Sequence, residues 1–412
     1  MFGKTEKHLK TGVGIMLVLV ILGLAILLIW EKSTVPAGTD GGQMAKELAP
    51  PAETEISVLC AGDVMSHIPQ TSAQYDAGTG RYNYKNNFEQ VKPYVEEADL
   101  ALCNVETTFA GAPYTGFPQF SAPDALAGAL KYAGFDVGIT ANNHMADKGK
   151  EGIQRTLNVL EKKGLDTVGS IKGEKDARYL ITEVKGIKIG IAAYTYETGA
   201  GGADVFINGS FVPRETAAHI NSFNFNTLKE DVPKIRKTVE AAKAAGAQVI
   251  IVYYHWGEEY QQSANAMQKK LAQETADMGA DIIFASHPHV LQEAEYLTAA
   301  GTNRKVPVFY SLGNFLSNQR AESLGNRYTE NGLMGIVNFT YTEGKGITGI
   351  TMDGIPTWVD KYFSDGKTVF EIIPLNQNLE KNETLSVSGH LSRARQARED
   401  ANGLFEFDHE KH

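Results

Sequence analysis

Five short polar motifs, each directly after an apolar run, hold the residues whose types and spacing could do chemistry. Their central residues are Asp63, Glu106, Asn143 with His144, His255, and His287 with His289. The apolar runs at 56–61, 100–103, 137–140, 249–254 and 282–285 predict buried strands. Because ligands of an open α/β sheet bind where parallel strands end, we expect these side chains to converge on one sheet edge. Acids, an amide and imidazoles brought together in this way are typical of a metal site that serves hydrolysis or binds an anionic substrate.

The oxygen ligands of such a site would come from two acids and one amide. Two divalent cations about 3.5–4 Å apart need a bridging oxygen ligand. We assign that role to Glu106, because a carboxylate offers two oxygens and a negative charge. Asp63 would supply a second carboxylate. The amide oxygen of Asn143 is neutral, so it would keep the net ligand charge low and the metals Lewis-acidic.

Three histidines would supply neutral nitrogen ligands, which suit Zn, Mn or Fe. They are His255, His287 and His289. In an extended segment the side chains of His287 and His289 would point the same way, because side-chain direction repeats every two residues. Pro288 between them would fix their separation. We therefore expect one or two divalent cations, which would activate water for attack on a substrate.

Polar residues next to these motifs have further uses. His144 is expected to face away from the metals, where it could protonate a leaving oxygen or steady a phosphoryl oxygen. Glu258 and Asp147 are either solvated acids or acceptors that orient an imidazole. Asn314 either holds a loop of the metal site in place or belongs to a plain turn.

The N-terminal segment predicts a membrane anchor. Residues 12–30 are almost purely apolar, and at ~1.5 Å per residue they span roughly 28 Å, about one hydrocarbon core. The run is longer than the apolar part of a signal peptide, and Trp30, Glu31 and Lys32 after it do not resemble a cleavage site. Three lysines before the span place residues 1–11 in the cytoplasm and the main domain outside the cell.

Composition argues against nucleic acid as a partner and against a disulfide framework. The net charge is −10, and the first 33 residues hold four lysines and two glutamates, which leaves −12 on the rest. A domain this acidic is a poor binder of nucleic acid. The two cysteines, Cys60 and Cys103, are too few for a disulfide framework, and we expect two buried apolar thiols.

Alternating strand and helix patterns predict a layered α/β domain over residues 55–375, after a flexible linker at 31–54. Helices are expected at 87–98, 125–133, 150–163, 226–245 and 264–278, several of them ending at glycine. Irregular stretches at 195–225 and 317–331 could overhang the strand ends. Antiparallel strands are expected at 333–341, 347–359 and 368–373. The remainder, 376–412, is expected to be a polar, solvated tail.

Together, the motifs resemble the capsule-biosynthesis CapA family, also called the PgsA component of poly-γ-glutamate synthesis. The resemblance covers roughly residues 55–374 and the N-terminal anchor. It is carried by Gly-Asp-Val-Met at 62–65, Asn-Val-Glu at 104–106, Ala-Asn-Asn-His-Met-Ala-Asp at 141–147, His-Trp-Gly-Glu-Glu-Tyr at 255–260, Ser-His-Pro-His-Val-Leu-Gln at 286–292 and Ser-Leu-Gly-Asn-Phe at 311–315.

This family is in turn similar to calcineurin-like metallophosphoesterases, which implies a four-layer α/β/β/α sandwich with a dinuclear metal centre. Carried over by motif, the metal ligands would be Asp63, Glu106, Asn143, His255, His287 and His289, and the catalytic histidine would be His144.

The chain departs from the phosphoesterase pattern in three places. Met65 stands where a histidine usually follows the first aspartate, Glu106 stands where an aspartate is usual, and Ser286 stands where a glycine is usual. Three alternatives follow: His67 supplies the missing ligand, one of two metals is weakly held, or the centre is mononuclear.

The resemblance implies a membrane-anchored extracellular component of capsule or poly-γ-glutamate biosynthesis, export or attachment, with a metal-dependent hydrolase or transferase centre. Its partners would be an anionic capsule polymer and other subunits of a capsule synthase. Arg320 and Arg327 would contact the anion or lie solvated in their loop, and residues 114–120 would form a substrate wall or a packed aromatic turn. The alternatives are an extracellular metallophosphoesterase and a non-catalytic scaffold.

Overall fold

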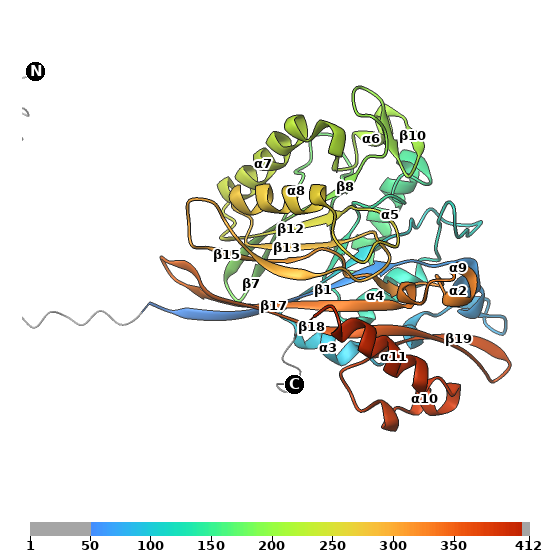
Figure 1. The fold of residues 1–412 in the computed structure, drawn as a ribbon. Coiled ribbons are helices and arrows are strands. Elements are labelled where there is room, and N and C mark those ends of the chain that lie inside the picture. Colours follow the sequence, from blue (N-terminus) through green and yellow to red (C-terminus); the bar gives the residue numbers. More distant parts are fainter. Residues whose placement is uncertain (1–50, 406–412) are drawn as a thin grey trace, which may run out of the picture. The chain divides into compact units, whose positions relative to one another are not determined.

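Two β-sheets lie face to face in the computed structural model, which describes residues 51–405 (Figure 1). In spatial order, the eight-stranded first sheet consists of β19 (Lys367–Pro374), β18 (Gly346–Ser364), β17 (Asn331–Thr342), β1 (Glu53–Val64), β4 (Leu100–Val105), β5 (Val137–Ile139) and β6 (Asp166–Val168), with β16 (Asn314–Leu316) beside β1. The seven-stranded second sheet consists of β11 (Ser222–Phe223), β8 (Ile187–Tyr196), β12 (Val249–His255), β13 (Ile282–Ser286), β15 (Lys305–Phe309) and β14 (Ala294–Thr298), with β7 (Leu180–Val184) beside β8.

Apolar side chains from both sheets fill the space between them. Ile56 and Val58 of β1 belong to the same buried cluster as Ile189 of β8 and Ile251 of β12. Every residue of β4 and of β12 is buried, because each strand is covered on both faces. This explains why these strands have continuous apolar runs rather than alternating ones.

Helices cover the outer face of each sheet, so the described chain has four layers, helix, sheet, sheet and helix (Figure 1). On the first sheet they are α3 (Lys92–Glu97), α4 (Ala125–Ala133) and α5 (Gly149–Lys162). On the second sheet they are α7 (Leu228–Ala244) and α8 (Ala266–Asp277). The expected glycine stops at 134, 164, 246 and 279 all have positive φ, as a helix C-terminus favours.

Cys60 and Cys103 are free and buried, as expected. They lie on opposite faces of the first sheet, because Cys60 faces the inter-sheet core and Cys103 faces the helices. Burial raises the pKa of both thiols.

Two predicted elements are wrong. The helix expected at 87–98 is a 3₁₀ turn at Lys85–Asn87 followed by α3, which has Pro93 in its first turn. Proline fits that position because the first N–H groups of a helix have no partner within the helix.

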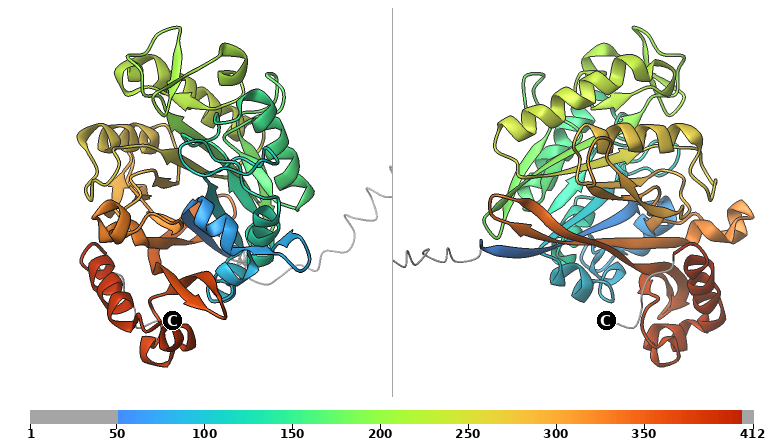
Figure 2. Two further views of the ribbon diagram at one scale, coloured as in Figure 1. Left: turned by 90° about the vertical axis from the view of Figure 1, so that its right-hand side faces the viewer. Right: turned by 60° about the vertical axis from the view of Figure 1, so that its left-hand side comes forward.

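The prediction of a solvated tail at 376–412 is also wrong for the part that the structure describes, residues 376–405. It folds into α10 (Glu383–Ser388) and α11 (Leu391–Asn402), which pack beside β18 and lie at the bottom of both views in Figure 2. Their apolar residues are few and small, but Leu385 and Ala394 are buried against Trp358 and Ile373.

The predicted segments 1–11 and 12–30, and most of the linker 31–54, lie outside the described residues. Within residues 51–405, no helix combines the length and the hydrophobicity that crossing a membrane requires.

Candidate metal centre

The candidate ligands come from strand ends of both sheets, and not from one sheet edge as expected. β1, β4 and β5 belong to the first sheet, whereas β12 and β13 belong to the second. Sequence alternation does not tell which strands share a sheet, so the prediction was wrong about the topology that brings these side chains together. The centre therefore forms where the carboxyl ends of two facing sheets meet.

A close approach of two chain segments positions Asp63. A Cβ atom on Gly62 would lie 2.0 Å from the carbonyl oxygen of Gly313, so only glycine fits there. The register of β1 against β4 shifts at this point, and the Asp63 N–H donates to the Gly313 carbonyl at 2.9 Å. These contacts hold the Asp63 carboxylate at the C-terminal end of β1.

The chain turns sharply after β13, and this turn directs two imidazoles into the centre. The backbone is not extended as predicted, because φ is 108° at His287 and 57° at His289. Positive φ costs of order 1–3 kcal/mol at a non-glycine residue, and such strain gathers at functional sites. The Pro288 carbonyl accepts the Tyr260 N–H at 2.7 Å, which ties the turn to the segment after β12.

Two buried carboxylates and an amide form the acidic side of the centre. The Asn104 Nδ2 atom lies 2.7 Å from Asp63 Oδ1 and 3.3 Å from Glu106 Oε2. Burial, followed by the nearby Asp63 charge, raises the pKa of Glu106 well above its usual range. The second oxygen, Glu106 Oε1, is buried without a hydrogen-bond partner. Nothing within the described residues donates a hydrogen bond to this oxygen.

Three imidazoles face these acids. His255 Nε2 lies 3.0 Å from Asn143 Oδ1, 3.2 Å from His287 Nδ1 and 3.7 Å from Glu106 Oε1. His289 Nδ1 lies 3.2 Å from Asp63 Oδ2, and its Nε2 lies 3.8 Å from Glu106 Oε1. Burial, and then the neighbouring imidazoles, lower the pKa values of His255 and His287 well below the usual range. Both rings are therefore neutral, as metal ligands must be.

Asp147 orients His144, which confirms the second reading of that acid. His144 Nδ1 lies 2.9 Å from Asp147 Oδ2, and the same oxygen accepts the Phe120 N–H at 2.6 Å. The Phe120 ring packs edge-on against His144 at 4.6 Å. Residues 114–120 thus supply a packed aromatic support behind His144. With Nδ1 donating to Asp147, Nε2 is the nitrogen left to exchange a proton.

Two asparagines of the centre had no assigned role in the sequence. Asn104 contacts both acids, and its Nδ2 also lies 3.3 Å from His255 Nδ1. Asn142 donates to Asn104 Oδ1 at 3.1 Å and to the Val105 carbonyl at 2.8 Å, which fixes the amide of Asn104. A signal existed, because Asn104 lies two positions before Glu106 and strand side chains alternate with period two.

Met65, an apolar residue, occupies the position at which the phosphoesterase pattern has a histidine ligand. Met65 is buried, and its N–H donates to the Leu316 carbonyl at 2.8 Å. The His67 ring borders the centre, but its Nδ1 lies 3.2 Å from Gln70 Oε1 and 3.3 Å from the Asn318 nitrogen. Burial lowers the His67 pKa to about 4. Among the described residues, no hydrogen bond or ion pair joins His67 to the two acids, so the structure does not support it as a replacement ligand.

The predicted substrate arginines are engaged elsewhere. Arg320 is buried, pairs with Glu330 at 3.3 Å and donates to the Val359 carbonyl. Arg327 contacts both oxygens of Asp400 at 2.9 Å. In the structure, each arginine stabilises the packing of residues 320–330 against the C-terminal part of the domain, and a contact with substrate stays a prediction.

Of the two residues with alternative roles, Asn314 contacts the candidate centre and Glu258 does not. Asn314 Oδ1 lies 3.1 Å from His289 Nδ1, and its Nδ2 donates to the Thr329 carbonyl at 2.8 Å, so this residue holds the metal-site loop. Glu258 is exposed, which fits a solvated acid.

A groove of about 310 Å³ opens beside Asn143 and Asp147. Its other wall is the hairpin of β9 (Val205–Ile207) and β10 (Ser210–Val212), within the irregular stretch that was expected to overhang the strand ends. Phe211 of this hairpin lines the groove and is 57% exposed. A substrate can therefore approach His144 from this side.

The model of the bacterial capsule synthesis protein PGA_cap family matches residues 57–319. The chain belongs to this family. The matched range includes all six candidate ligands and His144, so these residues lie within the family's own region.

Two curated relatives carry related names. The capsule biosynthesis protein CapA of Bacillus anthracis is 29% identical over 289 residues, which are 67% of this chain and 64% of that protein. The PGA biosynthesis protein CapA of Bacillus subtilis (strain 168) is 31% identical over 287 residues, 65% of this chain and 67% of that protein. The chain thus spans about two thirds of the length of these relatives.

Solved structures are similar at a greater distance. The sulfate thiohydrolase SoxB of Thermus thermophilus, in complex with glycerol, matches with a TM-score of 0.40 and 12% identity. The match covers 84% of this chain and 60% of the SoxB chain. TT1561 of Thermus thermophilus has a TM-score of 0.36 and 11% identity and covers 69% of this chain and 94% of its own.

Proposed function

We propose that this protein acts in capsule biosynthesis as a membrane-anchored extracellular component whose centre performs metal-dependent hydrolysis or group transfer on an anionic polymer such as poly-γ-glutamate. The family and the names of its relatives support the process. The donor set of the centre supports the chemistry. Other subunits of a capsule synthase would be its partners.

The observation that carries the chemistry is a buried acid pair in which one oxygen, Glu106 Oε1, has no hydrogen-bond partner among the described residues. Donor atoms of Asp63, Glu106 and His255 all lie within 4.8 Å of one another. The unpartnered Glu106 Oε1 points to a missing positive charge, because a buried carboxylate without a partner is costly. A divalent metal fits this set of carboxylate oxygens and neutral imidazoles.

The residues that would hold the metal are Asp63, Glu106, Asn143, His255, His287 and His289. When bound, such a metal polarises a substrate oxygen and lowers the pKa of water. A metallophosphoesterase-like centre of this kind is the finer form of the proposal, and Mn, Zn or Fe would suit it.

The chain's own groups would handle the proton. Asp147 fixes the His144 ring, so Nε2 can give a proton to a leaving oxygen. Phe120 excludes water behind the ring, because it packs against it and is itself buried. The groove beside Asn143 leaves room for the substrate on the open side.

Metal content tests this proposal most directly. The purified protein is analysed by elemental mass spectrometry together with Asp63→Ala, His289→Ala and the exposed neighbour Glu258→Gln as a control. We expect one or two equivalents of a transition metal, reduced in the first two variants and unchanged in Glu258→Gln. Two equivalents indicate a dinuclear centre, whereas one equivalent indicates that Met65 has removed a site.

The absence of tightly bound metal, with no recovery after adding Mn or Zn, would reject the catalytic proposal and favour a scaffold. Where metal is found, phosphoester and γ-glutamyl substrates are assayed with His144→Ala, which should retain metal and lose turnover.

A further inference from the structure

A cavity of about 550 Å³ at the edge of the second sheet is lined by three cations and by no acid. It lies where β11 and the outer face of β8 meet α7. The cations are Arg178, Lys234 and Lys237, and hydroxyl groups come from Tyr194, Ser222 and Thr238. The whole chain has 49 acidic and 39 basic residues, so a cavity with cations and no acid among its lining residues runs against its composition, although the Ser222 hydroxyl donates to Glu197 at 2.7 Å.

The charge of two of these cations is not compensated within the described residues. Arg178 donates to Asn221 Oδ1 at 2.9 Å and to the Ala218 carbonyl at 3.0 Å, both of which are neutral. Lys237 is exposed and makes no ion pair within residues 51–405. Lys234 pairs with Asp231 at 2.7 Å, so it adds less to the local potential.

A buried hydroxyl at the cavity also lacks a firm partner. Tyr194 is only 4% exposed, and its hydroxyl lies near Thr238 without closing a hydrogen bond of ordinary geometry. The Thr238 hydroxyl donates instead to the Lys234 carbonyl at 3.3 Å. A buried hydroxyl left unpaired is unfavourable, and an oxygen of a bound ligand would satisfy it.

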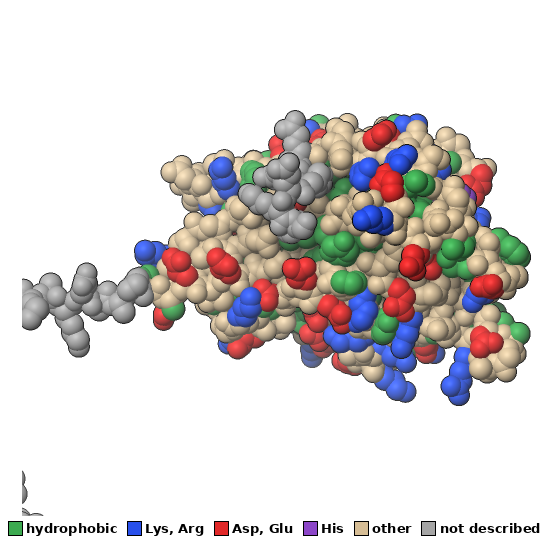
Figure 3. Space-filling view, turned by 90° about the horizontal axis from the view of Figure 1, so that it is seen from below, with side chains coloured by type: hydrophobic (Ala, Val, Ile, Leu, Met, Phe, Trp, Pro, Cys, Tyr) green, Lys and Arg blue, Asp and Glu red, His purple; other side chains and the backbone are tan. Residues whose placement is uncertain are grey.

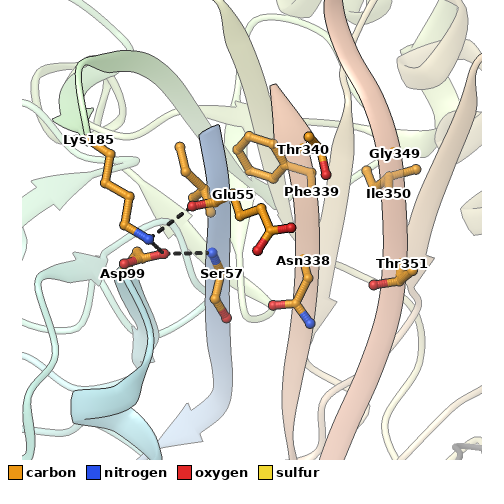
Figure 4. Close-up of a pocket in the computed structure, with 11 residues that line it drawn as sticks. Glu55, Ser57, Asp99, Lys185, Asn338, Phe339, Thr340, Gly349, Ile350 and Thr351 are labelled. Atoms are coloured by element: carbon orange, nitrogen blue, oxygen red, sulfur yellow. Dashed lines mark hydrogen bonds and ion pairs between the residues drawn. The ribbon is translucent and has the colours of Figure 1, made fainter. Parts of the chain in front are cut away.

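Another cavity among the described residues lacks this combination. In the cavity of about 410 Å³ shown in Figure 4, the single cation Lys185 is neutralised by Asp99 at 2.7 Å and also donates to the Glu55 carbonyl. On the face seen from below in Figure 3, acidic and basic side chains are interspersed. The cavity beside α7 is therefore the stronger candidate for an anion.

We propose that this cavity binds a carboxylate-bearing segment of an anionic polymer, at a place separate from the metal centre. The planar guanidinium of Arg178 matches a carboxylate, and Lys237 offers a second charge for the next one. Tyr179, Ile220 and Ala241 give the cavity apolar wall for methylene groups. Its volume falls within the ~300–1,000 Å³ of ordinary ligand sites. The identity of the polymer rests on the proposed function, whereas the anion site rests on the lining residues.

The test is a calorimetric titration of the full chain with a γ-linked glutamate oligomer, inorganic phosphate and a neutral glucan oligomer of similar length. A chelator is present, so that the result does not depend on a metal. We expect the glutamate oligomer to bind and to weaken as salt is raised. Lys237→Gln should weaken it about fivefold to twentyfold, and Tyr194→Phe about threefold to tenfold.

Lys229→Gln is the matched control, because Lys229 is exposed on the same helix and lies outside the cavity. It should bind the oligomer as the wild type does. Equal loss in Lys229→Gln, or wild-type affinity in Lys237→Gln, would overturn the site. If phosphate binds as tightly as the oligomer does, the assignment of a polymer as the ligand is overturned. If no probe binds, both the anion site and the polymer assignment are overturned. Asp63→Ala should keep full oligomer affinity, so failure of the metal centre and failure of this cavity give different results.

Discussion

Asn104 lies between the two carboxylates of the candidate centre and determines how they are held. Its Nδ2 contacts Asp63, Glu106 and His255, and Asn142 fixes its oxygen. The amide has two hydrogens for these three acceptors, so one acceptor is always shared or weakly bound. A residue that orients ligands in this way sets the affinity of a metal as much as the ligands do.

Replacing Asn104 with alanine should therefore weaken the metal without unfolding the protein. We expect a loss of about 10–100-fold in metal affinity, because Asp63 and Glu106 lose the donor that holds them in place. Competition with a chromogenic chelator measures the affinity. Asn338→Ala is the control, since Asn338 is exposed on β17 of the same sheet. Equal affinity in the wild type and Asn104→Ala would show that the amide does not organise the centre.

The sequence predicted that the candidate ligand side chains would converge, and it predicted their surroundings less well. Asp63, Glu106 and the three histidines follow apolar runs, and burial of those runs is what makes such side chains converge. The backbone at His287 and His289 could not be predicted, because positive φ at non-glycine residues depends on tertiary contacts. The environment of Arg320 could not be predicted either, since nothing in the local sequence indicates that Glu330 neutralises its charge.

At the scale of elements, the C-terminal helices were missed because their apolar surface is small. α11 buries alanines at 394, 397 and 401, and α10 buries Leu385. The three alanines have helical spacing, but alanine adds little hydrophobicity, so the apolar face of α11 is a weak signal in the sequence although tertiary packing orders the helix. The eight strands that were predicted, by contrast, all overlap observed strands, although β1 and β18 extend several residues beyond the predicted bounds, because long apolar runs leave few alternatives.

The packing of α10 can be tested with two substitutions on the same helix. Leu385→Ala should lower the free energy of unfolding by about 2–5 kcal/mol, because it leaves a cavity against Trp358 and Ile373. Val387→Ala should change it by less than about 0.5 kcal/mol, since Val387 is 65% exposed. Urea denaturation followed by tryptophan fluorescence measures both. Similar small effects would indicate that α10 does not pack on the sheet.

At the scale of the whole molecule, the centre joins two sheets that otherwise meet through apolar contacts. Carboxylates come from the first sheet, and His255 and the turn after β13 come from the second. Without a metal, two buried acids face each other at this junction. The arrangement is therefore unfavourable for the metal-free fold and favourable for the metal-bound one.

This trade-off predicts opposite effects of one substitution in two conditions. In chelator, Glu106→Gln should raise the free energy of unfolding by about 1–3 kcal/mol, because it removes a buried carboxyl group beside Asp63. With metal at 100 times its Kd, the wild type should gain about 2.7 kcal/mol, and Glu106→Gln should gain far less. Thermal and urea unfolding with and without Mn²⁺ measure both values, and Glu343→Gln on the β17–β18 turn is the exposed control.

The pH dependence of the metal-free protein follows from the same group. Because the Glu106 pKa is raised in the folded state, the folded protein keeps a proton that the unfolded chain releases above its ordinary value of 4.5. Stability in chelator should then fall as pH rises from 4.5 towards neutrality, and this contribution should be absent in Glu106→Gln. Equal pH slopes in the two proteins, together with an unchanged response to metal, would mean that Glu106 is neither strained by burial nor a ligand. The junction of the sheets would then owe its geometry to apolar packing alone.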